Sequence, residues 1–203
     1  MYAVLKELLI SLEKNFDSIP AERKELLKIL DKYIQKKRDQ KEAIQLLYVC
    51  THNSRRSHFG QIAATVAAAF YQIENVHTFS GGTEVTALHP NAINALRGVG
   101  LQVLLKEDGV NPKYLVSFGE SKQLLCFSKL YHDTTNPTSN FVAIMTCSDA
   151  ETNCPFIPGV ELRIGTTYND PKIADGTSNE AAVYRERLLQ ILTETLFAFS
   201  LVS

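Results

Sequence analysis

Strand-like and helix-like segments alternate along this chain from residue 44 to its end, and this alternation limits the fold more than any other feature of the sequence. Short runs of branched apolar residues predict strands, and longer segments with apolar residues at helical spacing predict helices. The predicted strands are residues 44–49, 76–80, 141–146 and 160–164, and the predicted helices are residues 56–72, 90–99 and 179–199. The alternation predicts an α/β fold with a small four-stranded parallel sheet, helices on both faces and a ligand site at the carboxyl ends of the strands.

Residues 1–43 precede this pattern and carry leucines at helical spacing on both sides of a break at residues 15–20. They predict an N-terminal helical extension, a hairpin of two helices, in front of an α/β domain of residues 44–203. Large apolar helix faces need a covering surface, so the hairpin could serve as a lid, as a scaffold or as the contact of a homodimer.

An insertion of about residues 106–140 lies between the predicted helix at 90–99 and the strand at 141–146. Two apolar stretches, residues 114–118 and 123–127, flank the turn-forming segment Gly119-Glu120-Ser121-Lys122 and predict a β-hairpin. Cys126 lies in this hairpin with no motif around it, and we expect it to be a buried structural thiol.

Cys50 ends the first predicted strand and begins a polar segment that runs into a long Ala-rich helix. The segment is Cys50-Thr51-His52-Asn53-Ser54-Arg55-Arg56-Ser57. A loop of this length can turn its backbone N–H groups inward to bind an anion, and the following helix adds the positive end of its dipole. Arg56 offers a planar guanidinium for two oxygens of a tetrahedral oxyanion, and Asn53 tolerates a left-handed backbone. The same positive field favours the thiolate form of Cys50, which predicts a nucleophile.

Two further cysteines, Cys147 and Cys154, lie seven positions apart after the strand at 141–146. Cys147 should therefore lie at the carboxyl edge of the sheet. A metal site is disfavoured, because two thiols without a second Cys or His pair leave a tetrahedral site incomplete. The residues alone leave open whether the pair is redox-active or consists of small buried apolar side chains.

Charge and cysteine usage exclude several classes of protein. The 203-residue chain has 21 basic and 22 acidic residues and a formal net charge of -1, so no global field attracts nucleic acid or an acidic membrane. No apolar stretch reaches spanning length and no signal pattern opens the sequence, so we expect a cytoplasmic protein. Four cysteines in an intracellular chain favour thiol chemistry over a structural disulfide framework.

The Cys50 loop resembles the Cys-X-X-Asn-X-X-Arg-Ser loop of the low-molecular-weight protein tyrosine phosphatases and their relatives, the thioredoxin-coupled arsenate reductases. The Cys-Thr-X-Asn-Ser form is most similar to the reductase branch. Other matching segments are Ser80-Gly81-Gly82-Thr83-Glu84, His89-Pro90-Asn91-Ala92, Cys147-Ser148-Asp149-Ala150 and Asn169-Asp170-Pro171. His52 stands where the family usually has Gly, and Arg55 stands where it often has a second loop Cys.

This resemblance implies a role for each matching residue. Cys50 would be the nucleophile, Arg56 would bind the oxyanion, and Asp170, in an Asp-Pro dipeptide that alone is more often a turn, would be the general acid. Cys147 and Cys154 would form a disulfide relay reduced by thioredoxin, so no bound cofactor is expected. The loop residues that would bind the oxyanion or support the loop are Thr51, His52, Asn53, Ser54, Arg55 and Ser57.

The leading prediction is thus a thioredoxin-coupled arsenate reductase that attacks a tetrahedral oxyanion, arsenate or phosphate, through Cys50. The alternative is a phosphatase that hydrolyses phosphotyrosine through a phosphocysteine intermediate, and Cys147 and Cys154 favour the reductase. A third hypothesis is a non-catalytic module whose loop binds an anion while the N-terminal hairpin recruits a partner.

Overall fold

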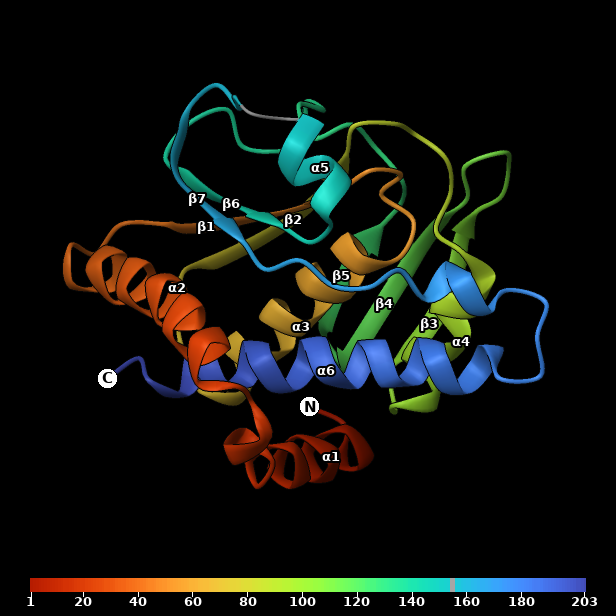
Figure 1. The fold of residues 1–203 in the computed structure, drawn as a ribbon, viewed down its shortest axis with the longest axis horizontal. Coiled ribbons are helices and arrows are strands. Elements are labelled where there is room, and N and C mark those ends of the chain that lie inside the picture. The colour runs from red at the N-terminus through yellow and green to blue at the C-terminus, as the bar shows by residue number, and fades with distance from the viewer. Residues whose placement is uncertain (154–155) are drawn as a thin grey trace.

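The computed structural model describes residues 1–153 and 156–203. Its centre is a four-stranded parallel sheet in the order β2-β1-β6-β7 (Figure 1). The strands are β1 (Ile44–Cys50), β2 (Val76–Gly82), β6 (Phe141–Met145) and β7 (Val160–Gly165). The predicted parallel sheet is therefore confirmed, and β1 occupies a central position with a partner strand on each side.

Helices cover both faces of this sheet, as predicted. The helices α3 (Arg56–Phe70), α6 (Glu180–Ser200) and α2 (Ala21–Asp39) lie on one face, and the short helix α5 (Ser148–Asn153) lies on the other (Figure 1). The helix α4 (Pro90–Gly98) packs against α6. No helix in the described residues is both long and apolar enough to cross a membrane.

The side chains of β1 divide between two hydrophobic cores, one on each face of the sheet. Leu46 and Tyr48 belong to the large core that includes α3 and α6, whereas Leu47 and Val49 belong to a smaller core with Ala150 of α5. Because successive strand residues point to opposite faces, a strand covered on both sides needs an uninterrupted apolar run. This explains why β1 carries consecutive apolar residues from Leu46 to Val49.

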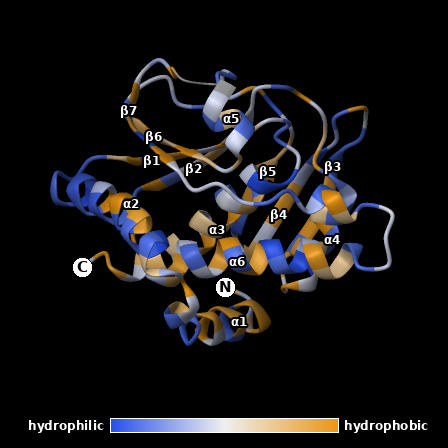
Figure 2. Cartoon of the chain, in the orientation of Figure 1, coloured by the Kyte–Doolittle hydropathy of each residue, from blue (hydrophilic) through white to orange (hydrophobic). Residues whose placement is uncertain are grey.

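The predicted N-terminal helical extension is confirmed, and it consists of α1 (Ala3–Glu13), the 3-10 turn η1 (Phe16–Ser18) and α2. Both helices pack against α6 more closely than against each other. Its leucines Leu5, Leu9, Leu27 and Leu30 are at most 2% exposed and share the large core with α6. The basic C-terminal end of α2 is strongly hydrophilic (Figure 2). The leucine faces are thus covered within the chain, and a homodimer through these helices stays a prediction.

The inserted β-hairpin is also confirmed, but it belongs to a larger unit than expected. The strands β4 (Lys113–Gly119) and β5 (Lys122–Cys126) pair antiparallel, and β3 (Gln102–Glu107) adds a third strand beside β4. This sheet begins at residue 102, before the predicted insertion boundary of about 106. Val103 is the only buried residue of β3, so this segment does not alternate between buried and exposed residues as a predictable strand would. Its strand conformation depends instead on pairing with β4.

Candidate active site

The Cys50 loop joins the end of β1 to the start of α3, at the carboxyl edge of the parallel sheet (Figure 1). Cys50 is the last residue of β1 and lies beside Gly82 of β2. It is 3% exposed. A parallel strand at the centre of a sheet, followed by a helix, places this loop where ligands bind in α/β folds.

Hydrogen bonds inside the loop fix the position of the Cys50 sulfur. The Ser57 Oγ lies 3.1 Å from the Cys50 Sγ, and the Asn53 Nδ2 donates to the same Ser57 Oγ at 2.8 Å. Because the hydroxyl accepts from Asn53, its own hydrogen is free to point at the sulfur. Asn53 has a φ of 44°, in the left-handed region that asparagine tolerates, and its Oδ1 accepts from the backbone N–H of Lys129 at 2.8 Å.

The backbone of the loop is oriented as an anion-binding nest. Its carbonyl groups face outward, since Cys50, Thr51 and Ser54 accept from backbone N–H groups of the segment 83–89. Within the described residues, the backbone N–H groups of 52–56 donate to no other part of the protein. These donors lie directly before the N-terminus of α3, and free N–H groups at a helix N-terminus favour an anion.

Arg56 and Asp170 meet beside this nest. The Arg56 Nη2 donates to the Asp170 Oδ2 at 2.5 Å, and its Nη1 donates to the Tyr168 carbonyl oxygen at 2.8 Å. The Arg56 Nε is buried and has no hydrogen-bond partner in the described part of the chain. Asp170 precedes the 3-10 turn η2 (Pro171–Ala174), and its Oδ1 accepts from the backbone N–H of Lys172 at 3.0 Å. These two hydrogen bonds use two of the five N–H donors of the guanidinium, so Nε and the second hydrogen of each Nη remain for an oxyanion.

Arg55 points away from its neighbour Arg56 and supports the loop from outside. Its Nε donates to the Tyr184 hydroxyl at 2.6 Å, and its Nη2 lies 3.0 Å from the Asp175 Oδ2. The Tyr184 hydroxyl donates to the Asp175 Oδ1 at 2.6 Å, and the His89 ring stacks on the Tyr184 ring. Burial alone would raise the pKa of Asp175, but the Tyr184 hydrogen bond and the Arg55 charge outweigh it and lower that pKa.

The two partners of Arg55, Tyr184 and Asp175, were missed by sequence reasoning as functional residues. They come from separate elements, and nothing in the spacing of Asp175 or Tyr184 indicates a contact with a residue 120 or 129 positions away. The available signal was weak: a tyrosine on the inward face of a long helix usually needs a partner for its hydroxyl.

Cys147 lies at the carboxyl edge of the sheet and contacts the Cys50 loop directly. Its Sγ is 3.5 Å from the Thr51 Oγ1 and accepts from the backbone N–H of Ala150 at 3.4 Å. It is fully buried and shares the smaller core with Cys50. Val49 pairs with Met145, so continuing this register by two residues sets Thr51 beside Cys147. Cys154 lies outside the described residues.

The remaining loop residues fasten the loop to neighbouring segments. The His52 Nε2 lies 3.4 Å from the Glu84 Oε2, and the His52 carbonyl oxygen accepts from the hydroxyls of Thr86 and Ser128. The Ser54 hydroxyl donates to the Ala87 carbonyl oxygen at 2.6 Å. Ser128 follows the inserted sheet, so the insertion helps to fix the loop, which the sequence did not indicate.

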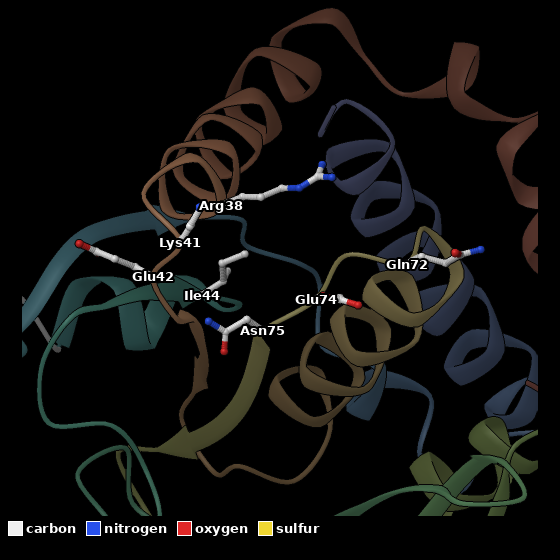
Figure 3. A pocket seen from close by; sticks show the side chains of 7 residues that line it. All are labelled: Arg38, Lys41, Glu42, Ile44, Gln72, Glu74 and Asn75. Atoms are coloured by element: carbon white, nitrogen blue, oxygen red, sulfur yellow. The ribbon is translucent and has the colours of Figure 1, made fainter.

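Two other features lie apart from this chemistry. Burial raises the pKa of the Cys126 thiol to about 12, as expected for a structural cysteine. A cavity of about 300 Å³ lies at the amino ends of β1 and β2, opposite the Cys50 end of β1 (Figure 3). It is lined by Arg38, Lys41, Glu42, Ile44, Gln72, Glu74 and Asn75.

Comparison with known proteins shows which curated proteins have a similar sequence. No family model matches the chain. An arsenate reductase of Shouchella clausii is 27% identical over 143 residues, which cover 70% of this chain and 85% of that protein. An arsenate reductase of Bacillus licheniformis is 24% identical over 156 residues, covering 76% and 94%.

Solved structures show the same fold. A low-molecular-weight phosphotyrosine phosphatase of Vibrio cholerae O395 matches with a TM-score of 0.52 and 15% identity, covering 76% of this chain and 94% of that chain. A mutant of YwlE from Bacillus subtilis matches with a TM-score of 0.50 and 12% identity, covering 78% and 97%. The resemblance found in the sequence is confirmed: the chain has the low-molecular-weight phosphatase fold and is similar to arsenate reductases.

Proposed function

We propose that this protein is an arsenate reductase whose reaction depends on its own thiols. The observation that carries the proposal is the position of Cys147, whose Sγ lies 3.5 Å from the hydroxyl of Thr51, the residue next to Cys50. Phosphate ester hydrolysis needs one thiol, whereas reduction of an oxyanion needs two electrons and therefore a second thiol close to the first. Similarity to curated arsenate reductases supports the same choice.

In the first step, the Cys50 thiolate attacks arsenic(V) of an arsenate bound by the loop N–H groups and Arg56. A sulfur–arsenic bond forms, and one arsenic–oxygen bond breaks. Asp170, released from Arg56 and protonated, gives its proton to the departing hydroxyl group of arsenate, which leaves as water. The Ser57 hydroxyl stabilises the thiolate before attack, because it lies 3.1 Å from the sulfur.

In the second step, the thiolate of Cys147 attacks the Cys50 sulfur. A Cys50–Cys147 disulfide forms, the sulfur–arsenic bond breaks, and its electron pair stays on arsenic, which leaves as arsenite. Cys154 then attacks Cys147, regenerates the Cys50 thiolate and leaves a Cys147–Cys154 disulfide. A dithiol protein of the thioredoxin kind supplies the two electrons that reduce this disulfide.

A second candidate function is phosphatase activity towards an aryl phosphate such as phosphotyrosine. The specific observation in its favour is the Arg56–Asp170 pair beside Cys50, because nucleophile, anion-binding guanidinium and acid suffice for phosphoryl transfer. Water would then hydrolyse a phosphocysteine, and Cys147 would take no part.

One comparison separates the two functions. Purified protein is incubated with thioredoxin, thioredoxin reductase and NADPH, and NADPH oxidation is measured with and without arsenate. Hydrolysis of p-nitrophenyl phosphate is measured in parallel, and Cys147→Ser is the matched variant for both assays. We expect arsenate-dependent NADPH oxidation that Cys147→Ser abolishes. Rapid ester hydrolysis with no arsenate-dependent oxidation would instead establish the phosphatase.

A further inference from the structure

We propose that Arg23, on the N-terminal hairpin, is a positioning residue for the oxyanion site and that it acts on Arg56 through Tyr168. The inference rests on the proposed function, because it concerns the binding of the oxyanion that Arg56 and the loop receive. It gives residues 1–43 a part in the chemistry beyond covering apolar surface.

Arg23 lies at the start of α2 and reaches across to two residues of the catalytic domain. Its Nε donates to the Glu194 Oε2 at 2.8 Å, and its guanidinium carbon lies 4.7 Å from the centroid of the Tyr168 ring. The Glu194 side chain is only 5% exposed and that of Arg23 16%. A stacked guanidinium paired with a buried carboxylate has one well-defined geometry, unlike an exposed ion pair.

The same carboxylate fixes Tyr168 from its other end. The Tyr168 hydroxyl donates to the Glu194 Oε2 at 2.9 Å. Burial and the nearby Glu194 charge raise the pKa of Tyr168, so its hydroxyl stays protonated and keeps donating. The ring is therefore held by stacking on its face and by a hydrogen bond at its tip.

Tyr168 transmits this constraint to the site through its backbone. Its carbonyl oxygen accepts from the Arg56 Nη1 at 2.8 Å, and its N–H donates to the Thr146 carbonyl oxygen at 3.1 Å. Asp170 follows two residues later and binds the Arg56 Nη2. If Arg23 no longer holds the ring of Tyr168, the Tyr168 carbonyl oxygen and the Asp170 carboxylate shift, and the Arg56 guanidinium loses its orientation.

The test measures binding of inorganic phosphate by isothermal titration calorimetry, which requires no catalytic turnover. Arg23→Met keeps the length of the side chain but removes its charge and planar group, and we expect it to bind phosphate about tenfold more weakly. Arg23→Lys keeps a charge for Glu194 but cannot stack as a plane, so its affinity should lie between those of Arg23→Met and wild type.

Lys24→Met is the matched control, since Lys24 is the next residue of α2 and faces Phe197 and Asp17 instead. Its phosphate affinity should equal that of wild type. A purely structural role for Arg23 would lower the melting temperature of Arg23→Met while leaving the phosphate affinity of the folded protein unchanged, and that result would overturn the inference.

Arg23→Met leaves the buried Glu194 carboxylate unpaired, so it could fail to fold. The double variant Arg23→Met/Glu194→Gln removes that charge and should show the same weakened phosphate binding. If this double variant binds phosphate as tightly as wild type and still reduces arsenate, the positioning role of Arg23 is rejected and the proposed function stands. Wild-type protein that binds neither phosphate nor arsenate would reject the proposed function, and the inference with it.

Discussion

Arg56 and Asp170, 114 positions apart in the sequence, are joined by a hydrogen bond of 2.5 Å between Nη2 and Oδ2. A tetrahedral oxyanion that binds the guanidinium through Nη2 would compete with the Asp170 carboxylate for this nitrogen. If Asp170 is the general acid, its displacement by the oxyanion would free it beside the leaving oxygen, and the pairing would couple oxyanion binding to release of the acid.

Asp170→Asn separates the pairing of residue 170 with Arg56 from its donation of a proton. An asparagine carbonyl can still accept from Arg56, but it carries no charge and cannot donate the required proton. We expect kcat to fall at least about a hundredfold, the lower end of the usual contribution of general acid catalysis. Phosphate should bind at least as tightly as to wild type, because a negative charge beside the anion is gone. Steady-state kinetics and calorimetry measure both quantities, and an unchanged kcat would remove Asp170 from the mechanism.

Ser57→Ala tests the hydrogen bond to the nucleophile. Loss of a charge-assisted hydrogen bond of about 1.5–3 kcal/mol should reduce the thiolate population of Cys50, so iodoacetamide should alkylate this cysteine at least about tenfold more slowly at neutral pH. Mass spectrometry of the labelled peptide gives the rate, and Cys50→Ser identifies the peptide. Equal rates for Ser57→Ala and wild type would show that the hydroxyl does not act on the sulfur.

Asp175→Asn tests the Arg55 support of the loop through its pH dependence. The pKa of Asp175 in the folded protein lies below its ordinary value of 3.8. Its carboxylate therefore stabilises the fold above that value, and the contribution is lost as pH falls towards the lower folded pKa.

Urea denaturation should thus show wild type as more stable than Asp175→Asn at pH 7, with the difference shrinking as the pH is lowered to about 3. The exposed Asp17, replaced in Asp17→Asn, is the control, and its variant should track wild type at every pH. A stability difference for Asp175→Asn that stays constant over this range would contradict the role of the charged pair.

The fold was predictable because its strongest signals are local. The apolar run of β1 is buried on both faces, and the helix pattern of α3 follows it directly, so strand, loop and helix could be read from adjacent residues. The same reasoning located Cys147 at the edge of β6. The short helix α5 was not among the predicted helices, although Asp149 and Glu151 near its start are favourable to a helix N-terminus.

The side-chain contacts that hold Arg55 and Arg23 in place were not predictable, because they join residues that are far apart in the sequence. Arg55 meets Tyr184 and Arg23 meets Glu194 only after α6 has packed against α2 and α3, and separations of 129 and 171 residues leave no pattern in one sequence. Arg55 was expected to support the loop, but its partners depend on tertiary packing.

The most direct test of the proposed function uses Cys154→Ser treated with arsenate and analysed by mass spectrometry without reduction. If Cys147 attacks Cys50, the variant should release one arsenite per enzyme and stop with a trapped Cys50–Cys147 disulfide, while any aryl phosphatase activity survives. Absence of an arsenate-dependent disulfide, together with unchanged hydrolysis of p-nitrophenyl phosphate, would contradict the reductase and leave a phosphatase of the same fold.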